Sequence, residues 1–226
     1  MTLARRLLNT VPQPKEFSPV LSQAYYPFIQ DTNDLSGKER HGLNTGASFD
    51  TRGGVPCIVL SGLSSYVSIP SYSLGLAYAV STWLYVPSQT TTTNIGAILR
   101  TCTEGWTGAG IEVILYSQGT AGFYIRYWWC GYNPPAVLTQ TLPYDTWMHV
   151  VFMRDSAALM SLYVNNELIG TVTNSITGNN LTSPNIGNYS NNNGNYGANE
   201  SFRNYRVFDK PLTAEERTAL FNESLT

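Results

Sequence analysis

Aromatic side chains with the chemistry to bind sugars gather in two parts of the sequence. One group follows a predicted strand and the turn after it, and the other lies in a glycine-rich loop and an asparagine-rich loop. The candidates are Trp106, Tyr124, Trp128, Tyr132, Tyr189 and Tyr196. Flat rings stack on the C–H faces of a sugar, and asparagine amides donate to one hydroxyl group and accept from another. These residues predict a ligand-binding surface, with ordinary packing as the alternative, and alternation favours Tyr124 or Trp128 as the exposed ring of the strand.

Two aspartates in a polar loop, Asp31 and Asp34, have the chemistry to hold a metal ion. With Asn33 between them, they offer the oxygen ligands that calcium prefers. Short side chains of this kind also accept hydrogen bonds from their own backbone in Asx turns. A calcium site and an Asx turn therefore stand as alternative predictions for this loop.

The acidic residues and the two histidines do not form a pattern typical of an enzyme. Glycoside hydrolysis needs two carboxylates that face each other across the sugar, which on one strand means acids two or four residues apart. The acidic residues are instead scattered, and Glu215 and Glu216 belong to a predicted helix cap. His149 is predicted to be a packed, hydrogen-bonded strand residue, and His41 to end a loop. We therefore expect a protein that is not an enzyme.

The composition favours one all-β domain over a protein that binds nucleic acid. The chain has 226 residues with 12% charged residues and a formal net charge of −2. A phosphate-binding surface needs clustered Lys and Arg, which this sequence lacks. No apolar run is long enough to cross a bilayer, and the first residues lack the apolar stretch of a secretory signal. The three cysteines have no CxxC spacing and are expected to be buried thiols, with a single disulfide as the alternative.

Short alternating strands must position these side chains. Residues 147–172 carry the strongest pattern, two apolar strands and a return strand joined by polar turns. About ten or more such strands, at intervals of about 8–15 residues, indicate a sandwich or barrel. A helix is predicted after Thr213, which forms a capping box with Glu216. Residues 1–20 are predicted to form an N-terminal arm, and residues 21–226 the domain.

Five short motifs follow one another in order along the chain. They are residues 24–28 (AYYPF), 81–84 (STWL), 145–150 (DTWMHV), 162–167 (LYVNNE) and 212–216 (LTAEE). In order and spacing they resemble the laminin-G-like domains of the concanavalin A-like lectin/glucanase superfamily. The resemblance implies an all-β fold, a two-sheet antiparallel jelly-roll sandwich with a short C-terminal helix, in which the first and last strands are neighbours. Members of the family mostly bind glycans, proteins or their own assembly, and some hydrolyse polysaccharides.

Fold and surface together favour a non-catalytic binding or structural module that presents loops to a glycan or protein surface. The predicted setting is the surface of a virus or phage particle, as a fibre, spike or decoration protein, with residues 1–20 contacting other virion proteins. One alternative is a free carbohydrate-binding lectin, in which assistance by calcium is open, and another is a polysaccharide hydrolase or lyase. Neither nucleic acid nor a membrane is expected as a partner, and a homo-oligomer remains open.

Overall fold

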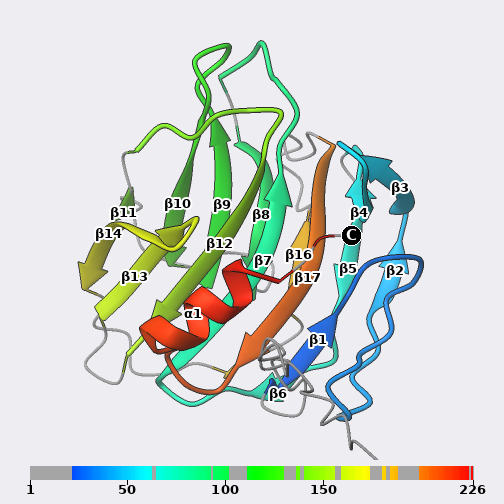
Figure 1. Ribbon diagram of the computed structural model, residues 1–226, viewed down its shortest axis with the longest axis vertical. Helices are drawn as coiled ribbons and strands as arrows, with labels where there is room; N and C mark the ends of the chain where they lie inside the picture. Colours follow the sequence, from blue (N-terminus) through cyan, green and yellow to red (C-terminus); the bar gives the residue numbers. More distant parts are fainter. Residues whose placement is uncertain are drawn as a thin grey trace, which may run out of the picture.

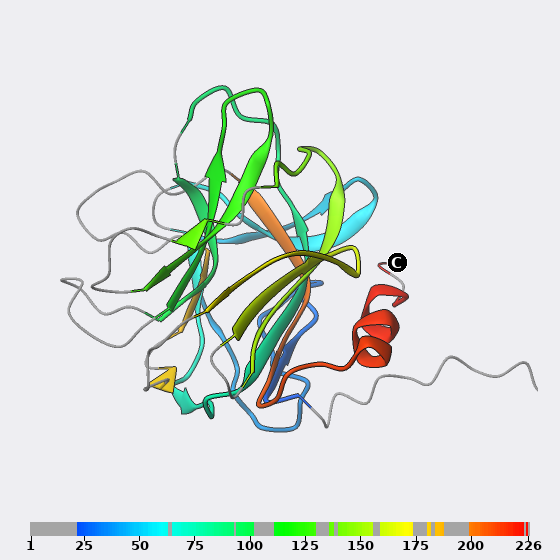
Figure 2. The same cartoon turned by 90° about the vertical axis from the view of Figure 1, so that its left-hand side faces the viewer.

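Two antiparallel β-sheets pack face to face to form a sandwich, and a helix lies on the outside of one of them (Figures 1 and 2). The structure is a computed structural model, and it describes residues 22–62, 65–92, 94–101, 111–129, 136–137, 140–155, 159–173, 180–181, 184–187, 199–223 and 225. This architecture confirms the predicted two-sheet antiparallel sandwich with a C-terminal helix.

Among the described residues, the first sheet has eight strands, with β17 in its middle. From one edge to the other the order is β14 (Glu167–Thr173), β13 (Leu159–Val164), β12 (Trp147–Arg154), β7 (Tyr78–Tyr85), β17 (Glu200–Phe208), β4 (Val55–Leu60) and β3 (Ser48–Arg52). A further strand, β1 (Ala24–Tyr26), also pairs with β17. The pairing of β1 with β17 confirms that the first and last strands are neighbours, and β12 to β14 confirm the predicted hairpin.

The second sheet has seven described strands and provides the other side of the core. Its order is β11 (Ala136–Val137), β10 (Phe123–Trp129), β9 (Ile111–Ser117), β8 (Asn94–Arg100), β16 (Asn185–Gly187), β5 (Tyr66–Ser68) and β2 (Leu43–Thr45). A separate antiparallel pair joins β15 (Asn180–Leu181) to β6 (Tyr72–Ser73).

Alternating apolar side chains explain why the two sheets face each other. In β12 of the first sheet, Val150 and Phe152 are buried in the core, and Ile125 and Tyr127 of β10 enter the same core from the second sheet. The rings of Tyr127 and Phe152 meet edge to face with their centroids 5.8 Å apart. Each buried side chain of this size contributes about 1.5–3 kcal/mol to folding. Because such contacts cross from sheet to sheet, the core is shared by both.

The helix α1 (Ala214–Phe221) begins at the predicted capping box. Thr213 Oγ1 accepts a hydrogen bond from the Glu216 N–H at 3.2 Å, and Glu216 Oε2 accepts one from the Thr213 N–H at 2.9 Å. At the other end of the helix, Phe221 stacks on Trp83 of β7 with ring centroids 5.9 Å apart. Leu220 is buried in a small apolar cluster on the same side of the sheet. The helix therefore covers part of the outer face of the eight-stranded sheet.

Two predictions fall wholly or partly outside the described residues. Residues 1–20, the predicted arm, are not among them, so the division into arm and domain stays a prediction. Cys57 is buried and free, as expected of a thiol, whereas Cys102 and Cys130 lie outside the described part. Within that part, no helix is long and apolar enough to cross a membrane.

Candidate functional site

The strands β9 and β10 bring a tyrosine pair and an arginine together on the outside of the seven-stranded sheet. They pair along their whole length, from Ile111↔Trp129 to Phe123↔Ser117. Successive side chains of a strand point to opposite faces, so this register separates two sets of residues. The inner set lies in the core and comprises Val113, Leu115, Phe123, Ile125 and Tyr127. The outer set includes Tyr116, Tyr124 and Arg126, which we call the Arg126 cluster.

The guanidinium of Arg126 is fixed between the two tyrosines. Its Cζ lies 3.5 Å from the ring centroid of Tyr116 and 5.0 Å from that of Tyr124, and the two rings lie 5.1 Å apart. Arg126 Nε donates a hydrogen bond to Tyr124 Oη at 3.1 Å, and Arg126 Nη2 donates to the same oxygen. Cation–π attraction and these hydrogen bonds hold the side chain in one position.

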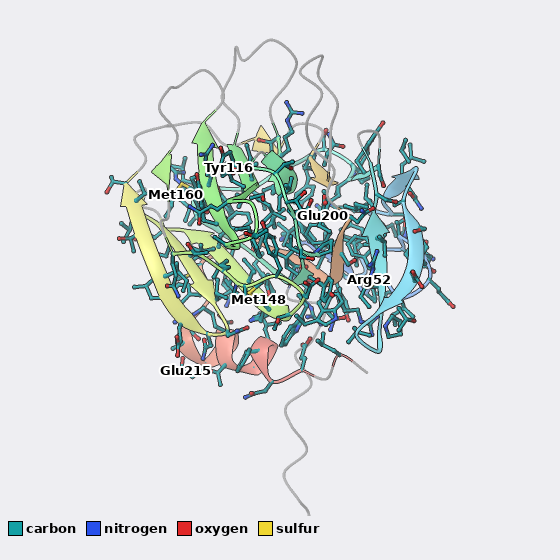
Figure 3. All side chains as sticks on the ribbon, turned by 90° about the horizontal axis from the view of Figure 1, so that it is seen from above. Arg52, Tyr116, Met148, Met160, Glu200 and Glu215 are labelled. Atoms are coloured by element: carbon teal, nitrogen blue, oxygen red, sulfur yellow. The ribbon has the colours of Figure 1, made fainter. Side chains whose placement is uncertain are left out.

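The Arg126 cluster is partly accessible, and its positive charge has no counter-ion among the described residues. Tyr116 and Arg126 are half-buried, and Tyr124 is 9% exposed. None of the described carboxylates forms an ion pair with Arg126, whereas Arg206 of β17 pairs with Glu223 at 2.7 Å. Figure 3 shows Tyr116 on the opposite side of the molecule from Glu215 of α1. The cluster can therefore offer hydrogen-bond donors to a polar ligand on the side away from the helix.

The structure places one of the six aromatic candidates in this cluster. Tyr124 is the predicted residue that contributes to it, but its side chain is buried, so it is not the exposed ring that alternation suggested. Trp128 belongs to β10, where its backbone pairs with that of Glu112, but its side chain is not among those described. The remaining candidates, which lie outside the described residues and stay predictions, are Trp106, Tyr132, Tyr189 and Tyr196.

Sequence reasoning missed the two residues that surround Tyr124. Tyr116 and Arg126 stand on neighbouring strands, and Tyr116 lies opposite Tyr124 in the ladder. The signal that could have found them is the tight connection between β9 and β10, because pairing across a short turn fixes which residues face each other.

The loop that contains Asp31 and Asp34 uses both carboxylates to hold its own backbone. Asp34 Oδ1 accepts from the N–H groups of Tyr25 and Ser36, at 2.8 and 2.9 Å, and Asp34 Oδ2 accepts from Ser36 Oγ and the Arg40 N–H, at 2.8 and 3.0 Å. Burial by itself would raise the pKa of Asp34, but these hydrogen bonds outweigh it and hold the pKa below its ordinary value.

The geometry of this loop matches the Asx-turn alternative. Asp31 accepts hydrogen bonds from the backbone and side-chain nitrogens of Asn33, at 3.1 and 2.7 Å. The four donors on Asp34 occupy the lone pairs that a calcium ion would need. Among the described residues, no group of three or more His, Cys, Asp or Glu side chains is placed to hold a metal ion. The residues present therefore do not fit calcium, and we derive no binding step through it.

Ser81 and His149 lie close together on the other outer face but lack what a catalytic pair needs. Ser81 Oγ is 2.8 Å from His149 Nε2. His149 is 2% exposed, and burial together with the nearby Arg206 lowers its pKa to about 3. Its Nδ1 has no hydrogen-bond partner in the described part of the chain, so no carboxylate orients the ring. The arrangement confirms the predicted packed, hydrogen-bonded histidine.

Comparison of the sequence with protein families gives one match. Residues 61–216 match the family described as the concanavalin A-like lectin/glucanases superfamily. No curated protein matches the sequence.

Solved structures with similar folds include the binding domain of a neurotoxin and one domain of an arabinanase. The binding domain of botulinum neurotoxin DC in complex with rat synaptotagmin II has a TM-score of 0.67 and 15% identity, over 92% of this chain and 52% of that one. Domain 4 of AbnA, a GH43 extracellular arabinanase from Geobacillus stearothermophilus, in complex with arabinotriose, has a TM-score of 0.64 and 19% identity, over 89% of this chain and 98% of that one. The chain thus spans about half of the neurotoxin domain and nearly all of the arabinanase domain. At these identities the likeness shows the fold alone.

Proposed function

Because the chain belongs to the concanavalin A-like lectin/glucanase superfamily, we propose that it is a non-catalytic module that binds carbohydrate on the outer face of its seven-stranded sheet. The superfamily includes glucanases as well as lectins, so the choice between them rests on the residues of this chain. The Arg126 cluster carries the proposal, because it combines aromatic rings with fixed N–H donors on an accessible part of the sheet. The cluster itself contains no carboxylate and no nucleophile paired with a base, so it suits binding and not hydrolysis.

The structural neighbours support a sugar as the ligand more directly than a protein. The arabinanase domain, nearly all of which this chain covers, was solved with an oligosaccharide, arabinotriose. The neurotoxin domain, about half of which it covers, was solved with a protein, synaptotagmin II. A protein ligand is therefore the second outcome that a binding experiment must be able to detect.

A glycan array followed by calorimetry on the full chain tests the proposal. Replacing Tyr116 by alanine removes the ring on which Arg126 rests, and we expect about tenfold weaker binding, equivalent to about 1.4 kcal/mol. The matched control is Tyr163→Ala, because Tyr163 on the other sheet also carries an arginine, Arg217, with its Cζ 3.9 Å above the ring. Equal loss of affinity in both variants, or no glycan binding by the native chain, would count against the proposal.

A separate proposal places the protein on a virus or phage particle, anchored by residues 1–20. The same residues could also join copies of this chain to one another. The proposal rests on the low content of charged residues, 12%, which suits a neutral polar surface, and on the predicted N-terminal arm. Analytical ultracentrifugation of the full chain and of a chain lacking residues 1–20 tests it. Assembly that is lost with those residues supports it, and monomers in both cases oppose self-association through the arm.

A further inference from the structure

We propose that the saccharide bound at the Arg126 cluster carries a carboxylate, and that Arg126 is the residue that selects it. The inference rests on the proposed function and narrows it from carbohydrates in general to acidic ones. Three features of the cluster support it: the covered ring face, the free edge of the guanidinium and the missing counter-ion.

The guanidinium of Arg126 covers one face of the Tyr116 ring and closes that face to sugar stacking. Arg126 Cζ already lies 3.5 Å from its centroid, and the ring of Tyr124 lies 5.1 Å away. A neutral sugar that binds mainly through its C–H groups needs a bare aromatic face. A ligand that approaches this cluster from solvent can reach the guanidinium as well as Tyr116, because both side chains are half-buried, whereas Tyr124 is buried.

One edge of the guanidinium has no hydrogen-bond partner among the described residues. Of its five N–H groups, two are donated to Tyr124 Oη, one from Nε and one from Nη2. Both lie on the same edge, so the edge between Nη1 and Nη2 remains available. Two parallel N–H groups at that edge match the two oxygens of a carboxylate, which they bind as a bidentate pair. The tyrosines thus fix the arginine in advance and reduce the entropy lost when a carboxylate binds.

The charge of Arg126 is not neutralised within the described part of the chain. Arg206 has Glu223 at 2.7 Å and Lys210 has Glu216 at 2.5 Å, whereas Arg126 has only the neutral tyrosines. A partly buried cation with neutral neighbours attracts an anion more strongly than one in open water, because the local dielectric constant is lower. The net charge of −2 gives the whole molecule no general attraction for anions, so any preference for acidic sugars has to be local.

Matched acidic and neutral sugars test the inference on the full chain. The probes are trigalacturonate and its methyl ester, together with 3′-sialyllactose and lactose, titrated by calorimetry. We expect at least one acidic probe to bind about tenfold or more tightly than its neutral partner. Arg126→Gln should abolish that difference. Arg217→Gln is the control, because Arg217 also lies over a tyrosine but belongs to α1 on the other sheet, and it should leave the difference unchanged.

The possible results separate the inference from the proposed function. Equal affinity for acidic and neutral probes would overturn the inference while the binding function stands, and no binding of any glycan would overturn both. 3′-Sulfolactose is titrated as a sulfated probe, and tighter binding of it than of both carboxylated probes would overturn the choice of carboxylate. If Arg126→Gln does not fold, Arg126→Lys replaces it. Lysine keeps the charge but lacks the two parallel N–H groups, so the preference for acidic over neutral probes should become smaller without disappearing. An unchanged preference in that variant would also contradict the inference.

Discussion

An arginine lies over a tyrosine on the outer face of each sheet, but the two contacts differ in what the arginine binds besides the ring. On the seven-stranded sheet, Arg126 and Tyr116 belong to adjacent strands, and the guanidinium keeps a free edge. On the eight-stranded sheet, Arg217 belongs to α1, lies over Tyr163 of β13 and donates to the Leu212 carbonyl at 2.9 Å. The contact of Arg217 with Tyr163 therefore holds α1 against the eight-stranded sheet, whereas the contact of Arg126 with Tyr116 positions a charged group on the seven-stranded sheet.

The surroundings of each arginine explain the difference. The outer face of the eight-stranded sheet is closed over much of its area: Phe221 covers Trp83, Glu223 neutralises Arg206, and His149 is 2% exposed. The Arg126 cluster has no helix over it among the described elements (Figure 2). One outer face therefore stabilises the fold, whereas the Arg126 cluster on the other carries no described helix, and three experiments test this contrast.

The largest expected effect is on the closed face. Leu220 is 1% exposed and packs with Val151 and Phe208, so Leu220→Ala should lower the free energy of unfolding by about 2–5 kcal/mol. Denaturant titration measures this loss, and calorimetry with the best glycan should show unchanged affinity. A parallel loss of affinity would mean that α1 contributes to binding, and the division between the two faces would then be wrong.

The second effect depends on pH. The pKa of His149 is about 3 in the folded protein, against about 6.5 in the unfolded chain, so the unfolded state binds more protons between these values. The stabilisation from His149 is complete above about pH 6.5 and is lost as the pH falls toward 3, by about 1.4 kcal/mol for each pH unit. Unfolding free energies at several pH values, for the native chain and His149→Gln, measure it.

The control for the pH effect is Leu220→Ala, which lowers stability without changing a titratable group, so its slope with pH should match that of the native chain. If His149→Gln also retains the full slope below pH 6.5, the buried imidazole is not its source.

The smallest effect compares the two charges directly. Arg206 is 4% exposed, and Glu223→Gln removes its counter-ion, so we expect a loss of about 1–3 kcal/mol in unfolding free energy with no change in glycan affinity. Arg126→Gln should show the opposite profile, with a loss of stability below about 1 kcal/mol and a clear change in binding. Similar stability losses in the two variants would show that Arg126 is as structural as Arg206.

The fold could be predicted further from the sequence than the site could. Alternation in β12 is a local pattern that predicts a strand, and the capping box of Thr213 and Glu216 is a local pattern that predicts the start of a helix. The Arg126 cluster depends on which residue of β9 faces Tyr124, and that register comes from pairing between strands, which no single strand's pattern specifies. Asp34 shows the same limit, because the folded loop alone brings together its four donors, three backbone N–H groups and the Ser36 hydroxyl.

The place of β17 has a consequence for how the protein is made. It is the last strand in the sequence, yet it joins β7 to β4 and also pairs with β1, and all nine of its residues are buried. A ribosome releases residues 200–208 only after all the other described strands of this sheet have been synthesised. Until then the two halves of the eight-stranded sheet have no strand between them, and the nascent polypeptide exposes unpaired edges that can associate with other chains.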